Sequence, residues 1–385
     1  MRIVAEADVL PEGVDIVAGP PSDTGARERM VDSVWPPEDQ KAFSVAGGTV
    51  APDWARSGSG CVRFPVDLAR VRAVHYAPEF GAVIDESGAV FKSTVNGATY
   101  VTPTLEQLPA VTLRDGVAGF KPPASAPHRR SASVFVPWGA RFNYGHFLID
   151  ALSGLAVLAD RGWLVRFPAL APPLDPWQRA LLDLMLQPGE AVEEIEAPIV
   201  LVDDLLFCSC MDHFLHGPNA PLQSVRSRIL AGLKSQGAAP VSARRLYLSR
   251  RSQAKRVMVN EAALESALVD RGFVVIEPER LPVAEQIALF READVIVGPT
   301  GAALANTLFM KQGAKMFELQ PENYTGIWCR ALAHLVDARW HGYFCPSPIE
   351  EAEMYLEGEL RPGLSFSWRL PIEDFLAFLD AHLGD

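Results

Sequence analysis

Cysteine is scarce in this chain of 385 residues, which contains only 5. They are Cys61, Cys208, Cys210, Cys329 and Cys345, an odd number spread thinly along the sequence. Small secreted domains held together by disulfides are rich in paired cysteines, so this pattern excludes that class and predicts reduced thiols in a cytoplasm. A single residue separates Cys208 from Cys210, which is too few for a zinc knuckle, so we expect free thiols there.

Long apolar runs and net positive charge are also missing. The most hydrophobic segment, 147–159, is interrupted by Asp150 and is shorter than the roughly 20 apolar residues of a membrane span. Acidic residues follow Met1 closely, so we expect no secretion signal and a cytoplasmic protein. The chain carries 35 Lys and Arg against 47 Asp and Glu, a net charge of −12. We therefore expect no nucleic-acid partner unless the basic residues cluster, no transmembrane segment, and at most a transient membrane contact. The oligomeric state is left open.

Two common nucleotide-binding motifs are absent as well. The chain has no GxxxxGK[ST] loop, which argues against a P-loop kinase or NTPase, and no GxGxxG fingerprint, which argues against a dinucleotide-dependent oxidoreductase. His213 and His216 form a His-x-x-His pair without a nearby third ligand, and Asp203-Asp204 is not an Asp-x-Asp motif. The sequence therefore predicts no metal site and no required cofactor.

What the sequence does contain is an alternation of strand-like and helix-like segments. Short β-like stretches occur before residue 118, at 82–84 and 89–91, and a Pro/Ser-rich loop or linker follows at 119–131. The pattern then predicts strands at 133–137, 163–167, 199–202, 245–249, 273–276, 294–297 and 315–319. It predicts helices at 144–161, 175–186, 261–271, 283–293, 302–310 and 372–383. Such alternation is typical of α/β proteins, and the length favours two Rossmann-like domains facing a cleft.

Three predicted loops could hold a nucleotide diphosphate. Arg250, Arg251, Lys255 and Arg256 follow the strand at 245–249, and arginine forks match phosphate oxygens. Gly298-Pro-Thr-Gly301 precedes a predicted helix, whose N-terminal N–H groups favour anions. Glu318, at the end of the next strand, could accept hydrogen bonds from ribose hydroxyls. The alternatives are a solvated basic turn, a tight strand-to-helix turn and a surface carboxylate.

A histidine and a carboxylate are spaced one helical turn apart in the longest predicted helix. His146, Asp150 and Ser153 fall on one face of that helix. A carboxylate beside an imidazole fixes its tautomer and stabilises its protonated form, which suits a general base. The alternative is the ordinary polar face of an amphipathic helix.

Several segments, taken in order, resemble glycosyltransferase family 61, whose bacterial branch is often described as capsular polysaccharide biosynthesis proteins. The segments are Asn143 to Asp150, Arg245 to Arg251 with Asn260-Glu261, Glu285-Gln286, Gly298 to Asn306 and Phe317-Glu318-Leu319. The resemblance covers residues 133 to 320, and the ordered combination is more specific than any one motif.

The resemblance implies a B-type glycosyltransferase fold and inversion at the anomeric carbon. Residues 1–118 would be a β-containing region packed on the acceptor domain, 119–236 the acceptor-side domain, and 237–385 the nucleotide-sugar donor domain. The implied donor-binding residues are Arg250, Arg251, Arg256, Gly298, Thr300, Gly301, Ala302, Asn306 and Glu318. Asn143 and Tyr144 would lie on the acceptor side, and His146 with Asp150 would be catalytic.

One position departs from the family pattern. Thr300 stands where many relatives carry His, and Ala303 replaces a second glycine, so backbone N–H groups are the expected donors in this loop. The expected function is transfer of a sugar to a glycan or glycolipid hydroxyl in capsule, lipopolysaccharide or exopolysaccharide biosynthesis. The alternatives are a nucleotide-sugar epimerase or hydrolase of similar fold, and a non-catalytic polysaccharide-binding assembly protein.

Overall fold

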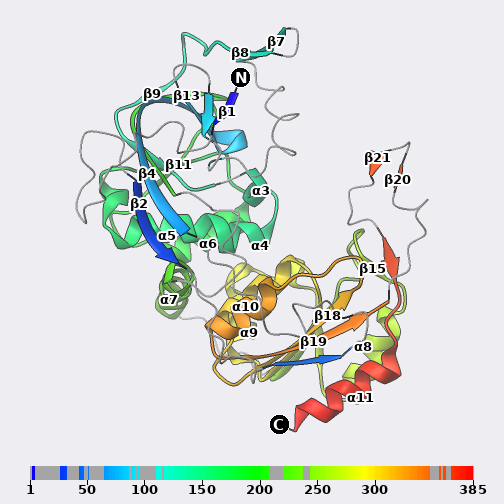
Figure 1. Cartoon of the computed structure of the whole chain (residues 1–385). Helices are drawn as coiled ribbons and strands as arrows, with labels where there is room; N and C mark the ends of the chain where they lie inside the picture. The colour runs from blue at the N-terminus through cyan, green and yellow to red at the C-terminus, as the bar shows by residue number, and fades with distance from the viewer. Residues whose placement is uncertain are drawn as a thin grey trace. The chain divides into compact units, whose positions relative to one another are not determined.

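A computed structural model shows a mixed α/β protein (Figure 1). It describes residues 2–4, 27–32, 43–46, 51, 65–85, 89–91, 94, 110–114, 117–136, 138–208, 220–236, 243–346, 355–356, 359–360 and 366–384. The chain splits into two compact units. The first unit comprises Met1–Val34, Arg63–Leu215 and Asn219–Ser235, and the second comprises Trp35–Val62, His216–Pro218 and Gln236–Asp385. The predictions made for Cys61, Cys210, His213 and His216 lie outside the described residues.

The first unit contains a mixed sheet. Its strands are β1 (Arg2–Val4), β2 (Arg27–Asp32), β4 (Pro65–Ala77), β5 (Ala82–Ile84), β6 (Ala89–Phe91), β9 (His128–Arg129), β10 (Ala132–Val134), β11 (Ala169–Ala171), β12 (Val192–Glu194) and β13 (Val200–Cys208). Strands β13, β10, β11 and β12 are parallel neighbours in that order, while β4 joins β13 and β5 in antiparallel pairing. A separate hairpin pairs β7 (Val111–Arg114) with β8 (Val117–Phe120). Because β11 and β13 lie on opposite sides of β10, the strand order reverses at β10, where open α/β sheets bind ligands.

The helices of the first unit include the two that the sequence predicted, at 144–161 and 175–186, and others that it did not predict, among them the one at 220–235. They are η4 (Pro78–Phe80), α3 (Trp138–Arg141), α4 (Tyr144–His146), η6 (Phe147–Ala151), α5 (Leu152–Asp160), η7 (Trp163–Val165), α6 (Pro176–Met185) and α7 (Ala220–Ser235). The helix predicted at 144–161 is confirmed as α4, η6 and α5 in succession. The strand predicted at 163–167 is wrong, because this segment is a 3-10 turn in which Arg166 and Phe167 both donate to the Trp163 carbonyl. Trp163, Leu164 and Phe167 are buried in that turn while Val165 is exposed, and the strand begins only at Ala169.

The second unit contains a parallel sheet. Its order is β16 (Val274–Ile276), β14 (Arg245–Leu248), β17 (Val295–Pro299), β18 (Lys315–Pro321), β19 (Arg339–Cys345) and β3 (Phe43–Ala46). Short pairs join β15 (Val257–Met258) to β22 (Ser367–Trp368) and β20 (Tyr355–Leu356) to β21 (Glu359–Leu360). The chain places β16 on one side of β14 and β17 on the other, so the topological switch point lies between the carboxyl ends of β14 and β17.

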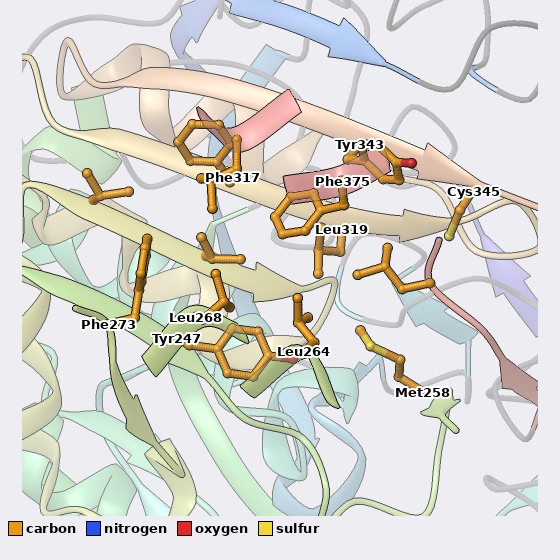
Figure 2. Packing of buried hydrophobic residues seen from close by; sticks show 14 of the residues in the cluster. Tyr247, Met258, Leu264, Leu268, Phe273, Phe317, Leu319, Tyr343, Cys345 and Phe375 are labelled. Atoms are coloured by element: carbon orange, nitrogen blue, oxygen red, sulfur yellow. The ribbon is translucent and has the colours of Figure 1, made fainter. Parts of the chain in front are cut away.

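Helices cover both faces of this sheet (Figure 1). One face packs against α8 (Glu261–Val269) and α11 (Ile372–Leu383), through a core cluster that includes Tyr247, Leu264, Phe317 and Phe375 (Figure 2). The other helices are η9 (Pro278–Arg280), α9 (Val283–Glu292), η10 (Ala302–Phe309) and α10 (Trp328–Leu335). The helix predicted at 302–310 is a 3-10 helix rather than an α-helix.

A helix that spans a membrane must be both long and apolar. None of them is both long and apolar enough to span a bilayer.

Candidate active site

The switch point of the second unit brings two predicted phosphate loops together. Strand β14 ends at Leu248 and strand β17 ends at Pro299, and the residues after each strand meet. A Cβ atom built on Gly301 would overlap the guanidinium group of Arg250. The φ of Gly301 is 173°, an extended value open to any residue, so close approach and not backbone strain calls for glycine here. The sequence predicted each loop separately, and the fold makes them neighbours.

The Gly298–Gly301 segment uses part of its backbone within the sheet. Gly298 belongs to β17, and a Cβ there would lie 3.1 Å from the side chains of Leu248 and Leu304, so its small size permits close packing. The Thr300 N–H donates to the Leu319 carbonyl at 2.9 Å. The Thr300 N–H is therefore engaged within the fold, and the backbone N–H groups left to face a ligand are those at the start of η10.

Arg250 is a half-buried cation at this site. Its Nη2 donates to the Lys255 carbonyl at 3.1 Å, and its backbone N–H donates to Glu261 Oε1 at 2.7 Å. Burial, followed by the nearby charge of Arg256, lowers the pKa of Arg250 to about 10. Two cations held close together out of water favour a bound anion.

Arg256 is the second half-buried cation. Its guanidinium lies 4.3 Å from the centroid of the Tyr324 ring, and burial lowers its pKa. Among the described residues, neither Arg250 nor Arg256 forms an ion pair, and the Nε atom of each is buried without a hydrogen-bond partner. Arg251 differs, because it is exposed and pairs with Glu265 at 2.9 Å. The local charge balance therefore favours Arg250 and Arg256 as anion ligands over Arg251.

Two further residues that were predicted to bind the nucleotide-sugar donor are buried inside the second unit. Glu318 is fully buried, and Trp340 Nε1 donates to its Oε2 at 2.9 Å. Asn306 is also buried and donates from Nδ2 to Gln286 Oε1 at 3.2 Å, which joins η10 to α9. Gln286 and Asn306 both belong to the segments that resemble the family, and this hydrogen bond gives them a structural role. The ribose-binding role of Glu318 stays a prediction.

The buried carboxyl of Glu318 makes the stability of the second unit depend on pH. Burial raises its pKa from 4.5 to about 7, against hydrogen bonds led by Trp340. The folded pKa exceeds the unfolded pKa, so the folded state holds a proton between these values that the unfolded chain releases. The contribution is therefore fully present below pH 4.5 and lost as the pH rises through 7, a change of about 3 kcal/mol.

We predict that Glu318→Gln removes this pH dependence. The free energy of unfolding of the wild type should fall by about 3 kcal/mol more than that of the variant between a pH below 4.5 and one above 7. Denaturant unfolding of both proteins at the two pH values measures the difference. Glu285→Gln, at an exposed position of α9, is the control and should behave as the wild type. Parallel pH profiles for wild type and Glu318→Gln would contradict the prediction.

We also predict that Gly301→Ala weakens anion binding without unfolding the protein. The added methyl group must displace the Arg250 guanidinium, which we expect to cost about tenfold in affinity for inorganic pyrophosphate by calorimetry. Gly384→Ala is the control, because a Cβ there meets no atom within 4 Å. Equal pyrophosphate affinities for Gly301→Ala and wild type would show that anion binding does not depend on the present position of the Arg250 guanidinium.

The first unit holds the predicted histidine and carboxylate in contact. His146 Nδ1 lies 2.6 Å from Asp150 Oδ2, with side-chain exposures of 35% and 1%. A carboxylate at Nδ1 favours the tautomer with its proton on that nitrogen and leaves Nε2 as the basic atom. The arrangement can therefore accept a proton at Nε2 and hold the resulting charge.

The local helix geometry positions this pair. Asn143, which was predicted to lie on the acceptor side, caps the helix: its side-chain oxygen accepts a hydrogen bond from the His146 N–H at 3.2 Å. Asp150 lies in the π-helical turn η6, where Leu152 N–H donates to the Phe147 carbonyl. Such single π turns are frequent at functional sites. The Tyr144 ring packs 5.7 Å from that of Trp177 on α6.

Metal-ligating side chains do not gather in the described part of the chain. No group of three or more His, Cys, Asp or Glu residues there could hold a metal ion. The described Asp203 contacts His128 at 2.7 Å, and Asp204 pairs with Arg70. Cys208, Cys329 and Cys345 are buried thiols that take part in no disulfide.

Some residues of the second unit's site carried no signal in the sequence. Tyr324, Trp340 and Trp368 contact Arg256 or Glu318 from distant parts of the chain. Their aromatic side chains gave no periodicity or motif that separated them from ordinary core residues.

The second unit therefore holds two half-buried arginines at a doubly wound switch point, and the first unit holds a histidine–carboxylate pair on a helix. Residues 144–317 match the Glycosyltransferase 61 family model, which confirms the resemblance to glycosyltransferase family 61. The matched range contains the predicted site residues except Asn143 and Glu318, which border it.

A curated relative points the same way. The EGF domain-specific O-linked N-acetylglucosamine transferase of Drosophila melanogaster is 35% identical over 75 residues. That alignment covers 19% of this chain and 14% of the relative. The family model and this relative are thus both glycosyltransferases to which part of the chain is similar.

Proposed function

We propose that this protein is an inverting glycosyltransferase. It would move a sugar from a nucleotide-sugar donor to a hydroxyl group of a glycan or glycolipid acceptor in cytoplasmic steps of capsule, lipopolysaccharide or exopolysaccharide biosynthesis. The observation that carries the proposal is the contact of Arg250 with Gly301 at the switch point, beside a second cation without an ion pair. The B-type arrangement of two Rossmann-like domains is part of the proposal.

The donor diphosphate would bind at the arginine pair. Arginine forks hold phosphate oxygens through charge-assisted hydrogen bonds, and the buried Nε atoms of Arg250 and Arg256 have no hydrogen-bond partner. The charges of Glu261 and Glu279 act on Arg250, but neither forms an ion pair with it in the described residues. The N–H groups of Gly301 and Ala302 would add neutral donors at the start of η10. These groups would stabilise the negative charge that develops on the departing nucleoside diphosphate.

The acceptor would be activated by His146. Its Nε2 would take the proton of the acceptor hydroxyl while that oxygen attacks the anomeric carbon and the bond to the diphosphate oxygen breaks. Asp150 would hold the imidazolium that forms, through the 2.6 Å contact at Nδ1. Attack opposite to the leaving group gives inversion.

The test is a transfer assay with the purified full chain. Nucleotide sugars with uridine, guanosine, cytidine and thymidine bases are offered with glycan and lipid-linked acceptors, and products are identified by mass spectrometry and the anomeric configuration by NMR. Transfer with inversion supports the proposal, whereas transfer with retention overturns its mechanism. Consumption of donor without acceptor would favour an epimerase or hydrolase. A melting temperature unchanged by every nucleoside diphosphate would favour a non-catalytic binding protein.

A further inference from the structure

The backbone of Arg256 adopts a conformation that favours glycine. Its φ is +55°, in the left-handed region that residues with a Cβ rarely occupy. A glycine would adopt this turn more readily, yet the position carries a long charged side chain. Strained backbone of this kind persists where the surrounding structure enforces it, and it is frequent at functional sites.

A segment near the C-terminus enforces this conformation. Trp368 Nε1 donates to the Arg256 carbonyl at 2.9 Å. On the strand that follows Arg256, the N–H groups of Val257 and Val259 donate to the carbonyls of Phe366 and Trp368, each at 2.9 Å. The backbone of Arg256 is thus tied to residues more than a hundred positions away, by one indole and a short parallel pairing.

A second pair of hydrogen bonds joins the segment after Arg256 to the same C-terminal segment. Asn260 donates from Nδ2 to the Leu370 carbonyl at 2.8 Å, and its Oδ1 accepts the Leu370 N–H at 3.0 Å. Trp368 and Leu370 are themselves buried in the core cluster of the second unit. Figure 2 labels Met258 and Phe375 of the same cluster. The C-terminal segment is therefore a fixed support, anchored by the core, for the loop that carries the arginines.

The side chain of Arg256 is placed from the opposite direction. Its guanidinium packs over Tyr324, and the neighbouring Arg250 donates to the carbonyl of Lys255, which belongs to the peptide bond leading into Arg256. A rotation of the Arg256 backbone would therefore move both cations. The anion site depends on a turn whose geometry one indole hydrogen bond helps to fix.

We propose that Trp368 is a positioning residue for anion binding, which acts by holding the backbone of Arg256 in the turn that presents both arginines to a diphosphate. This inference rests on the proposed function, because it takes the diphosphate of a nucleotide sugar as the ligand. Trp368 itself does not touch the ligand. Removing its N–H group lets the turn relax and lowers the fraction of protein with both guanidinium groups in place.

A double-mutant cycle with inorganic pyrophosphate as the probe tests this role. Calorimetry at low ionic strength measures its affinity for wild type, Trp368→Phe, Arg256→Ala and the double variant. We expect Trp368→Phe to weaken binding by about three- to tenfold in the wild-type background. The same change should have a clearly smaller effect once Arg256 is alanine, because only Arg250 is then left for the turn to position. A purely structural role of Trp368 would lower affinity equally in both backgrounds.

Controls separate folding from positioning. Trp163→Phe makes the same chemical change in the first unit and should leave pyrophosphate affinity unchanged. Asn260→Ala breaks the second contact without touching the core indole, and it replaces Trp368→Phe in the cycle if that variant does not fold. Unchanged affinity in Trp368→Phe, or equal losses in both backgrounds, overturns the inference alone. Failure of the wild type to bind pyrophosphate or any nucleoside diphosphate overturns the proposed donor site and the inference together.

Discussion

Replacing His146 with alanine is expected to lower kcat for sugar transfer by about 10²–10⁴, the usual contribution of a general base. The histidine contacts the buried Asp150 at 2.6 Å, so its Nε2 is the atom left to accept a proton. Binding of pyrophosphate should be unchanged, because the expected loss is confined to proton transfer. Steady-state kinetics with saturating donor and acceptor, together with pyrophosphate calorimetry, measure both quantities.

The chain offers a matched control for this variant. His128 and Asp203 form another histidine–carboxylate contact in the first unit, at 2.7 Å, but both side chains are more than half exposed. His128→Ala should therefore retain wild-type kcat. This result would show that removing a histidine–carboxylate pair elsewhere in the unit does not by itself lower kcat. If His146→Ala kept kcat within about tenfold of the wild type, the general-base role would be wrong.

Replacing Arg250 with alanine is expected to weaken binding of pyrophosphate and of the nucleotide-sugar donor by about 10- to 100-fold. Charge-assisted hydrogen bonds to phosphate are among the strongest in proteins, and this guanidinium is half-buried, where water screens it poorly. The dependence of affinity on salt should also become less steep, because one cation is lost. Calorimetric titration at several salt concentrations measures both effects.

Two other arginines provide control variants for Arg250→Ala. Arg244 lies at the opposite end of strand β14 and pairs with Asp294 at 2.9 Å, so Arg244→Ala should leave affinity unchanged. Arg251→Ala should have a smaller effect than Arg250→Ala, because Glu265 already neutralises Arg251. If Arg251→Ala proved the more damaging of the two neighbours, the assignment of the diphosphate to Arg250 and Arg256 would have to be abandoned.

Much of the fold followed from local patterns in the sequence. The helix at α6 was predictable because Asp175 and Gln178 form a capping box around Pro176 at the first helical position. The alternation of strands and helices from β14 to β18 was predictable for the same kind of reason, since each of these elements carries its own periodicity, whereas α10 and β19 were not predicted. The strand prediction at 163–167 failed because Trp163, Leu164 and Phe167 can be buried in a tight turn as well as in a strand, and only long-range pairing separates the two outcomes.

The candidate site divides in the same way. The sequence by itself determined the His146–Asp150 contact, because an i,i+4 spacing on one helix is a local property. It also placed cations after β14 and small residues after β17. The tertiary structure alone decided that these two loops meet, that Glu265 neutralises Arg251, and that Trp368 ties down the backbone of Arg256. Strand order and contacts between distant segments arise from packing of the whole chain, and no local spacing in the sequence encodes them.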